Sequence, residues 1–265
     1  FDTWFSSGQW PYATLGFPDS KDFKNYYPTD VMETAGEIIF FWVSRMIMLG
    51  LYVTGKLPFS TVYLHGLVLD GKGQKMSKSK GNVINPLEYM EKYGTDAFRM
   101  GIVIGNTPGT SLALSEEKIK AYKLFANKLW NVTRFILTSV GEIKVDKSFT
   151  DWSGKDKEYN ERFSSLKSEV TKEMDEFKFY MVAEKLYSYV WHELASVLLE
   201  DSKKVFQEGS ESDKKSRNQF LLNTLNDVLI LLHPFMPFIT EEIWTDFPKD
   251  DSSKDKILMI QKWPE

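Results

Sequence analysis

The pattern of hydrophobic and polar positions changes character near Ser115. Before this residue, short apolar runs alternate with glycine and proline, as they do where strands and helices follow one another in an α/β domain. After it, apolar residues recur every three or four positions over long stretches, which indicates amphipathic helices. The sequence therefore predicts an α/β part over residues 1–115 and an all-α part over residues 116–265.

The first part contains two predicted strands with a helix between them. β-Branched and apolar residues favour strands at 31–35 and 61–69, and the largely apolar stretch 37–52 is long enough to form a buried helix. The Asp-Gly dipeptide at 70–71 is typical of a tight turn. A helix is expected over 85–94, because an asparagine cap and a proline at the first helical position begin it and a glycine ends it.

The second part begins with a strong helix start. Ser115 stands before two glutamates, so a side-chain cap is followed by negative charge at the positive end of the helix dipole. Further helices are expected near 159–177, 179–206 and 218–232, and Thr240 is the expected cap of a short last helix. Their apolar stripes predict an antiparallel bundle with a shared core. In the first helix the stripe consists of Ile119, Tyr122, Phe125, Leu129, Val132 and Ile136.

Composition excludes several classes of protein. Hydrophobic residues make up 42% and aromatic residues 15% of the 265 positions, which is enough for sizeable cores and argues against a disordered chain. The longest apolar stretch, 38–52, contains Arg45 and falls short of the ~18 residues that span a bilayer, so no membrane partner is expected. The chain has no cysteine and its three histidines are far apart, so neither disulfides nor a protein-bound metal is expected. The lack of disulfides suits a cytoplasmic protein.

The net charge of −4 is unevenly distributed. Residues 1–115 hold 10 basic and 10 acidic side chains, whereas residues 116–265 hold 23 and 27. Any contact between the helical part and a nucleic acid must therefore use a local basic face rather than the overall field.

Residues 71–82 form a lysine-rich segment flanked by glycines. Lysines stand at positions 72, 75, 78 and 80, and no acidic residue interrupts them. Lysine is a compact charge on a long stem, and a loop between glycines can close over a ligand, so the segment suits a polyphosphate. It lacks the spacing of a Walker-type phosphate loop. On charge alone, a solvated surface loop is the more common explanation for such a run.

Residues 75–79 read Lys-Met-Ser-Lys-Ser, which resembles the signature of the class I aminoacyl-tRNA synthetases. They follow a predicted strand and turn and precede a capped helix, as they do in that family. Residues 2–7, 37–46 and 125–131 are similar to valyl-tRNA synthetases in particular, so the resemblance covers nearly the whole chain. It implies the second half of a Rossmann-type nucleotide-binding domain over 1–115, followed by an all-α, helical-bundle anticodon-binding domain.

In that family the loop acts in amino-acid activation, in which the amino-acid carboxylate attacks the α-phosphate of ATP and pyrophosphate leaves. The resemblance implies that Lys78 and Lys75 are the catalytic residues that contact the phosphates, and that Ser77 adds a hydrogen bond. Catalysis would then rest on positioning and charge stabilisation. ATP, accompanied by Mg²⁺, is the expected substrate. Lys72 and Lys80 lie outside the five-residue match and are expected to be solvated.

Four further positions resemble the ATP site of the family. Gly36 and Glu37 lie where a glycine and an acid hold the ribose, although many members carry aspartate there; an acid that only stabilises a helix start is the alternative. The strand with His65 and Val68 resembles the segment whose main chain contacts adenine, with Val68 as the expected contact. His65 is equally compatible with a hydrogen-bonded core histidine.

Trp4, Ile38 and Trp42 match positions that line the valine pocket of the family. Ile38 and Trp42 are four residues apart, so an α-helix would place them on one face. Large rigid walls would leave a small apolar hole that excludes isoleucine by overpacking. Packing in an aromatic core is the alternative. Such a pocket discriminates poorly against threonine, which is why editing is needed in this family.

The helical part resembles the anticodon-binding domain of the valine, isoleucine, leucine and methionine subgroup. Its expected partner is valine tRNA, beside ATP and valine for the catalytic part, and the whole protein is expected to be a monomer. Trp130 in the matching segment 127–134 is expected to serve packing, and His233 begins the segment 233–238, which is expected to form a structural bend.

The second signature of the family, His-Ile-Gly-His, does not occur in these 265 residues. The chain also begins within an aromatic-rich stretch, so we expect a piece of a longer enzyme that is inactive by itself. Two alternatives remain open. One is a piece of an isoleucyl-tRNA synthetase, and the other is a non-catalytic module for RNA binding or protein interaction that derives from a synthetase.

Overall fold

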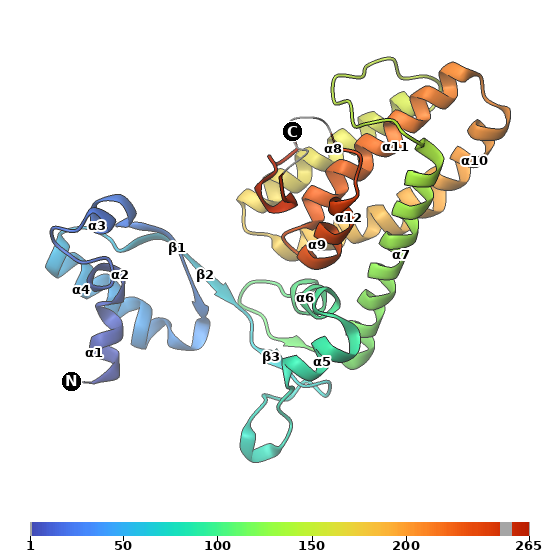
Figure 1. The fold of residues 1–265 in the computed structure, drawn as a ribbon. Coiled ribbons are helices and arrows are strands. Elements are labelled where there is room, and N and C mark those ends of the chain that lie inside the picture. The colour runs from blue at the N-terminus through green and yellow to red at the C-terminus, as the bar shows by residue number, and fades with distance from the viewer. Residues whose placement is uncertain (1, 250–255, 265) are drawn as a thin grey trace. The chain divides into compact units, whose positions relative to one another are not determined.

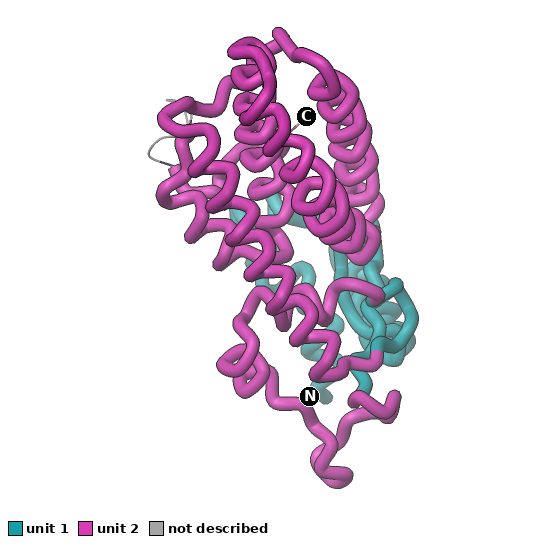
Figure 2. Tube along the Cα trace, turned by 90° about the vertical axis from the view of Figure 1, so that its right-hand side faces the viewer, with its two compact units in different colours: residues 1–69, 106–112 teal, residues 70–105, 113–265 magenta. Residues whose placement is uncertain are grey.

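The computed structural model describes residues 2–249 and 256–264. The chain divides into two compact units, which Figure 2 colours separately: unit 1 holds residues 1–69 and 106–112, and unit 2 holds residues 70–105 and 113–265. Unit 1 contains the parallel strands, and unit 2 is almost entirely helical (Figure 1). The predicted fold class, an α/β part followed by a helical bundle, is confirmed.

Unit 1 is built around two parallel strands that pair from Thr29 opposite Phe59 to Ala35 opposite His65. A second, short pairing follows, in which the N–H of Leu112 donates to the carbonyl of Leu67 at 2.8 Å. The strands predicted at 31–35 and 61–69 are thus present, the second one interrupted at Gly66. The elements are α1 (Thr3–Gly8), α2 (Trp10–Ala13), α3 (Lys21–Tyr26), β1 (Thr29–Ala35), β2 (Phe59–His65), β3 (Val68–Leu69) and β4 (Leu112–Ala113).

The connection between β1 and β2 is helical, but its geometry changes along its length. It runs through a 3₁₀ turn, η1 (Gly36–Ile38), a π-helical turn, η2 (Ile39–Val43), and the α-helix α4 (Ser44–Thr54). Only one side is covered: Val43 and Met46 are buried together with Phe59 of β2. The expectation of a buried helix is wrong, because a sheet of two strands shields one face only, and Phe40 and Tyr52 keep 74% and 89% of their surface exposed.

The length of this helical segment also corrects an expectation from the sequence. Gly36–Thr54 spans 19 residues with a mean hydropathy of 1.5, so by length and composition it could cross a membrane. Helices that pack inside proteins have the same composition. In this structure Met46 packs against Phe59, but only 17% of the apolar window of the segment is buried.

Unit 2 consists of a long loop and a set of packed helices. Ser115 caps the longest helix of this unit, because its hydroxyl accepts the N–H of Lys118 at 3.2 Å. Every residue of the apolar stripe predicted for that helix is buried. The elements are η3 (Lys78–Lys80), α5 (Pro86–Tyr93), α6 (Thr95–Val103), α7 (Glu116–Val140), α8 (Asp156–Asp175), α9 (Phe179–Ser188), η4 (Tyr189–Leu198), α10 (Leu199–Glu208), α11 (Glu211–Leu232), α12 (Pro237–Thr245) and η5 (Leu258–Ile260).

Helix α11 lies at the centre of the bundle, with residues 219–222 and 224–232 buried on all sides. It begins seven residues before the predicted start at 218, because Ser210 and Asp213 form a capping box. The helix predicted over 179–206 is continuous in sequence, but its middle third, η4, adopts π-helical hydrogen bonding. Hydrophobic spacing indicates that a helix exists without fixing its hydrogen-bond register.

Helix α12 is not capped by Thr240, as the sequence suggested. Thr240 is fully buried inside the helix and donates to the carbonyl of Met236 at 2.8 Å. The carboxylate of Asp96 from α6 caps the helix instead, because its two oxygens accept the N–H groups of Phe238 at 3.2 Å and Ile239 at 2.7 Å. A tertiary contact has therefore replaced the local cap.

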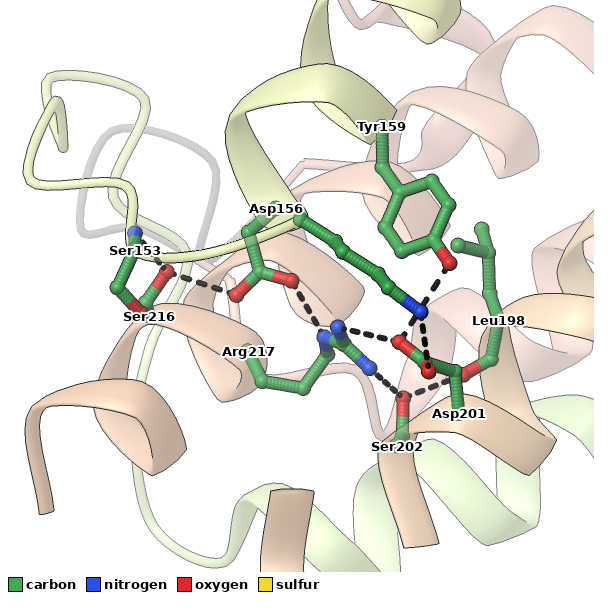
Figure 3. Close-up of polar contacts among 9 residues, drawn as sticks. Ser153, Asp156, Tyr159, Leu198, Asp201, Ser202, Ser216 and Arg217 are labelled. Carbon is green, nitrogen blue, oxygen red and sulfur yellow. Dashed lines mark hydrogen bonds and ion pairs between the residues drawn. The ribbon is translucent and has the colours of Figure 1, made fainter. Parts of the chain in front are cut away.

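A buried charge network joins α8, α10 and α11 (Figure 3). The guanidinium of Arg217, 2% exposed, donates to Asp156 at 2.5 Å, to Asp201 at 3.0 Å and to the hydroxyl of Ser202 at 3.0 Å. Burial raises the pKa of Asp156, and hydrogen bonds from Ser216 and Arg217 oppose that shift. The network satisfies each buried charge, as a stable interior requires.

Candidate functional site

The lysine-rich segment lies between β3 and α5, where it extends away from the neighbouring helix in Figure 1. It opens with a tight turn in which the N–H of Gly73 donates to the carbonyl of Asp70 at 2.9 Å. Lys75 and Lys78 are both exposed, as are the two lysines outside the signature. The turn predicted at Asp70-Gly71 is confirmed.

The side chains of two residues, Asp70 and Asn82, hold this loop through contacts that the sequence analysis did not predict. The carboxylate of Asp70 accepts the N–H groups of Lys72 at 2.9 Å and Gln74 at 2.8 Å, and it accepts the amide of Asn82 at 2.8 Å. The same Asn82 amide contacts the carbonyl of Lys75 at 3.3 Å. The only sequence signal was the aspartate that opens the turn, since aspartate often bonds to backbone two residues on.

Ser77 is fixed through its backbone. Its N–H donates to Asn82 Oδ1 at 2.9 Å, and its hydroxyl lies 3.2 Å from the hydroxyl of Ser79. Lys78 follows at the start of η3, which ends at Gly81 in the left-handed conformation (φ 64°). The backbone of the signature is therefore ordered by hydrogen bonds while its lysine side chains are exposed to solvent.

The other residues assigned to ATP lie in unit 1. Gly36 and Glu37 come directly after β1, and His65 ends β2, opposite Ala35 in the register. Open α/β sheets bind ligands at the carboxyl ends of their parallel strands. Gly36, Glu37 and His65 all lie at that edge of the sheet. Val68 lies three residues beyond His65, in β3. A Cβ at Gly36 would meet no atom within 4 Å, so this side of the edge is open.

The side chain of His65 is partly exposed rather than part of a core. Its Nδ1 lies 3.0 Å from the carbonyl of Gly66, and its Nε2 lies 3.4 Å from a carboxylate oxygen of Glu33. Its ring is thus held at the strand end by its neighbours.

Gly66 allows an unusually close approach of another chain segment. A Cβ at this position would lie 1.4 Å from the carbonyl oxygen of Thr110 and 2.4 Å from the carbonyl carbon. The N–H of Gly109 donates to the carbonyl of Leu64 at 2.9 Å, so residues 106–112 run directly along the end of β2. Only glycine fits here.

The residues assigned to the amino-acid pocket all lie near helix α1 and the turn η2. The indole N–H of Trp42 donates to the carbonyl of Ser7 at 3.1 Å, and Trp4 stacks on Phe41 with ring centroids 5.9 Å apart. Ile38 departs from α-helical geometry (φ −111°) and precedes the π-helical turn. The expectation that an α-helix would set Ile38 and Trp42 on one face is therefore wrong. Both side chains are partly exposed.

A second candidate surface lies in unit 2 between α7 and α12. A cavity of about 370 Å³ is present there. Trp130 lines this cavity with 46% of its surface exposed, and the expectation that it serves packing stays a prediction. The buried hydroxyl oxygen of Thr133 has no hydrogen-bond partner among the described residues. The cavity is lined by Trp130, Thr133, Arg134, Leu137, Thr138, Glu242, Ile243 and Asp246.

Two family models match the chain. Residues 1–115 match the family described as tRNA synthetases class I (I, L, M and V). Residues 156–265 match the family described as the anticodon-binding domain of tRNA ligase. The first match contains the signature lysines, and the second contains most of the helical bundle.

Curated relatives are similar along nearly the whole chain. A valine–tRNA ligase of Pelagibacter ubique is 44% identical over 99% of this chain, and one of Geobacillus kaustophilus is 43% identical over 100%. A valine–tRNA ligase of Dehalococcoides mccartyi is 45% identical over 92%. The chain spans about 30% of the length of these relatives.

Solved structures share the fold at low sequence identity. The ternary complex of Agrobacterium radiobacter K84 agnB2 LeuRS with tRNA and LeuAMS superimposes with a TM-score of 0.78 at 19% identity, over 99% of this chain and 32% of that one. A Mycobacterium tuberculosis methionyl-tRNA synthetase in complex with methionyl-adenylate gives a TM-score of 0.72 at 22% identity, over 93% of this chain and 51% of that one.

Proposed function

The chain belongs to the class I tRNA synthetases of the isoleucine, leucine, methionine and valine group, and on that premise we propose that it is part of a longer valine–tRNA ligase. The similarity to proteins named valine–tRNA ligase, along 92–100% of the chain, carries this proposal. In the proposed reaction, the valine carboxylate attacks the α-phosphorus of ATP and pyrophosphate leaves. The valyl group of the adenylate then passes to valine tRNA, and AMP leaves.

In this proposal the loop supplies the positive charge for the first step. Lys78 and Lys75 stabilise the negative charge on the phosphates in the transition state, and Ser77 contributes a hydrogen bond. The exposure of both lysines supports this role, because an ammonium group at the surface of a loop can be reached by the phosphates of an incoming nucleotide. Mg²⁺ is expected to accompany ATP, and no residue of this chain is assigned to it.

The strand ends of unit 1 are proposed to hold the nucleoside. Glu37 accepts hydrogen bonds from the ribose hydroxyls, while Gly36 leaves room for the sugar. The main chain near Val68 and the ring of His65 face the adenine. What supports these assignments is the position of the residues at the carboxyl ends of β1 and β2.

Valine is proposed to bind against Trp4, Ile38 and Trp42. The two indoles are held rigidly, one by its hydrogen bond to α1 and the other by stacking, and rigid walls reject a larger side chain. The exposed apolar side chains of Gly36–Thr54 would, in the longer enzyme, pack against the remainder of the nucleotide-binding domain.

For the helical part, we propose that residues 116–265 form a tRNA-binding domain. The lining of the cavity contains both the exposed indole of Trp130 and the guanidinium of Arg134. Unstacked RNA bases bind such surfaces by stacking and by hydrogen bonds to their edges.

The experiment for the catalytic proposal is valine-dependent ATP–pyrophosphate exchange by the complete ligase, with isoleucine as the comparison. We expect faster exchange with valine, and no exchange from residues 1–265 alone. Faster exchange with isoleucine would identify an isoleucyl enzyme. A complete protein that binds tRNA but exchanges with no amino acid would instead be a non-catalytic RNA-binding module.

The experiment for the tRNA proposal uses the chain itself. Binding is measured with valine tRNA and with the same tRNA carrying a changed anticodon, at two salt concentrations. Preference for the unchanged anticodon supports recognition by the helical part. If the chain bound both tRNAs equally and the binding weakened steeply with salt, the interaction would consist only of attraction to the phosphates.

A further inference from the structure

The contacts inside the lysine loop converge on one acid and one amide. Asp70, at the start of the loop, and Asn82, at its end, are joined by a hydrogen bond of 2.8 Å between Asn82 Nδ2 and Asp70 Oδ2. This bond closes the segment into a ring whose perimeter contains the whole signature, residues 75–79. A closed ring loses less conformational freedom on ligand binding than an open loop.

Each of the two side chains also forms hydrogen bonds with the backbone inside the ring. Asp70 Oδ1 accepts the N–H groups of Lys72 and Gln74, which fixes the backbone that leads into the signature. The Asn82 amide uses both of its ends: Oδ1 accepts the N–H of Ser77, and Nδ2 contacts the carbonyl of Lys75. The peptide groups on both sides of Met76 are therefore bound to one side chain.

Met76 itself provides a third attachment. Its sulfur accepts the N–H of Ile84 at 3.2 Å, and its side chain is partly buried. The residue in the middle of the bound backbone is thus anchored to the chain that follows the loop. Lys75 and Lys78 are left exposed on a backbone that is fixed.

We propose that Asp70 and Asn82 are positioning residues for amino-acid activation, which hold the backbone from Lys75 to Ser77 so that the signature lysines meet the phosphates of ATP. This inference rests on the proposed function. Charge stabilisation of a transition state depends on donors that are in place before the charge develops. A lysine stem is flexible, so the position of its Cα decides which region its ammonium group can reach.

The charge on Asp70 is compatible with this role. The N–H of Gln74 and the amide of Asn82 hold the pKa of Asp70 below its ordinary value, so the carboxylate stays ionised at neutral pH. Its hydrogen bonds to Lys72, Gln74 and Asn82 use both oxygens. The carboxylate therefore serves the backbone of the loop and the Asn82 amide as an acceptor.

The chemistry of the pair suggests an exchange experiment. In Asn82→Asp, a second carboxylate faces Asp70 where an amide donor stood. In Asp70→Asn, two amide NH₂ groups face each other. In the double variant D70N/N82D, the donor and acceptor are exchanged: the new amide at 70 donates to the new carboxylate at 82, and that carboxylate still accepts the N–H of Ser77. The contact of Asn82 with the carbonyl of Lys75 is the one bond that the double variant cannot restore.

The test is valine-dependent ATP–pyrophosphate exchange by the complete ligase and by the three variants. Each single variant is expected to lower kcat by about tenfold to a hundredfold with the KM for valine within about threefold, and the double variant is expected to recover about tenfold. Lys80→Gln, an exposed loop residue without an assigned role, is the control and is expected to stay within about twofold. Single variants with wild-type kcat, or a double variant no better than the worse single one, would overturn the proposal.

A second measurement separates this proposal from the proposed function. Hydrogen exchange of the Ser77 and Gln74 amides is followed in the 265-residue chain and its variants. Faster exchange in both single variants and recovery in the double one supports the positioning of the backbone, even if the wild type failed to activate any amino acid. Unchanged exchange in the single variants would overturn the positioning role, whatever the activity.

Discussion

Asp96 accepts a hydrogen bond of 2.7 Å from the N–H of Ile239, which lies 143 residues further along the chain. Arg99, one turn further along the same helix, donates to the carbonyls of Pro234 at 2.8 Å and Phe235 at 3.2 Å. Helix α6 therefore satisfies both the N–H groups at the start of α12 and the carbonyls of the turn before it. These contacts connect α6 to the short helix α12.

Asp96→Ala should destabilise unit 2. The variant removes the cap of α12 and leaves two N–H groups without their acceptor, and the loss of a helix cap costs roughly 0.5–2 kcal/mol. Thermal unfolding followed by circular dichroism in the far ultraviolet measures the effect. Glu91→Ala, an exposed acid on α5, is the matched control and should stay within about 0.5 kcal/mol of the wild type. Equal midpoints for the two variants would contradict the capping role.

His233 should make the stability of unit 2 depend on pH. Its Nδ1 lies 2.8 Å from Thr240 Oγ1, and its Nε2 is buried without a partner among the described residues. Burial lowers the pKa of His233 below 6.5; Glu241 and Asp96 oppose this shift, and Arg99 adds to it. The unfolded state therefore binds more protons between the folded pKa and 6.5, so stability should fall as the pH drops through that window.

His233→Asn tests this linkage. An asparagine amide can still donate to Thr240, but it does not titrate. When the pH is lowered from about 7 to about 5, the urea concentration at the unfolding midpoint should decrease more for the wild type than for the variant. Parallel pH profiles for the two proteins would exclude His233 as the source of the dependence.

Lys78→Ala in the complete ligase should lower kcat for valine-dependent ATP–pyrophosphate exchange by about 10²–10³, the usual cost of removing one transition-state donor. Lys80→Ala removes the same charge two residues away and, like Lys80→Gln, should stay within about twofold. The comparison separates a specific contact from the general positive field of the loop. If both variants lost the same activity, only the field would matter.

Gly66→Ala should disrupt unit 1. The added Cβ would lie 1.4 Å from the carbonyl oxygen of Thr110, so the backbone must move, and overpacking costs about 1–3 kcal/mol or more. The loss should appear as a lower unfolding midpoint and a lower soluble yield. Gly71→Ala, whose Cβ would come no closer than 3.8 Å to another residue, is the control. A Gly66→Ala protein with the wild-type midpoint would show that residues 106–112 can shift without cost.

Arg217→Met should be among the most damaging single changes in unit 2. It leaves the carboxylate of Asp156 buried without its cation, and breaking a buried ion pair costs about 3–5 kcal/mol. Burial by itself would raise the pKa of Asp201 too, but hydrogen bonds from Arg217 and Lys155 outweigh it and keep that pKa below its ordinary value. Lys214→Met, which removes a surface pair with Glu211 on the same helix, should cost about 0–1 kcal/mol. Chemical denaturation of both variants measures the difference.

Local sequence signals predicted much of unit 2. Ser115 begins α7 as expected, and the buried stripe of that helix matches its three- and four-residue spacing because a helix presents such residues on one face. The asparagine cap of α5 is also present, with Asn85 accepting the N–H of Leu87 at 3.2 Å. These features depend on residues within one or two turns of each other, so the sequence contains all the information they need.

Features that depend on distant partners were not predictable in this way. The cap of α12 comes from another helix, and the π-helical turn at Ile39–Val43 cannot be distinguished from an α-helix by hydrophobic spacing. Within the candidate site, the resemblance singled out Lys75 and Lys78, and their catalytic role stays a prediction. The pairing of Asp70 with Asn82 was missed, because twelve positions separate them and no periodicity relates an acid at a turn to an amide beyond a loop.

Because residues 106–112 return to unit 1, the order of synthesis leaves one strand incomplete for a time. The carbonyls of Leu64 and Leu67 emerge from the ribosome before their donors, Gly109 and Leu112. At about 5–20 residues per second, the interval between Leu64 and Gly109 lasts about 2–9 seconds. During that interval the nascent chain presents an unpaired strand end, which a chaperone can bind and a second nascent chain can pair with. The rate at which codons 70–105 are translated should therefore influence the yield of folded protein.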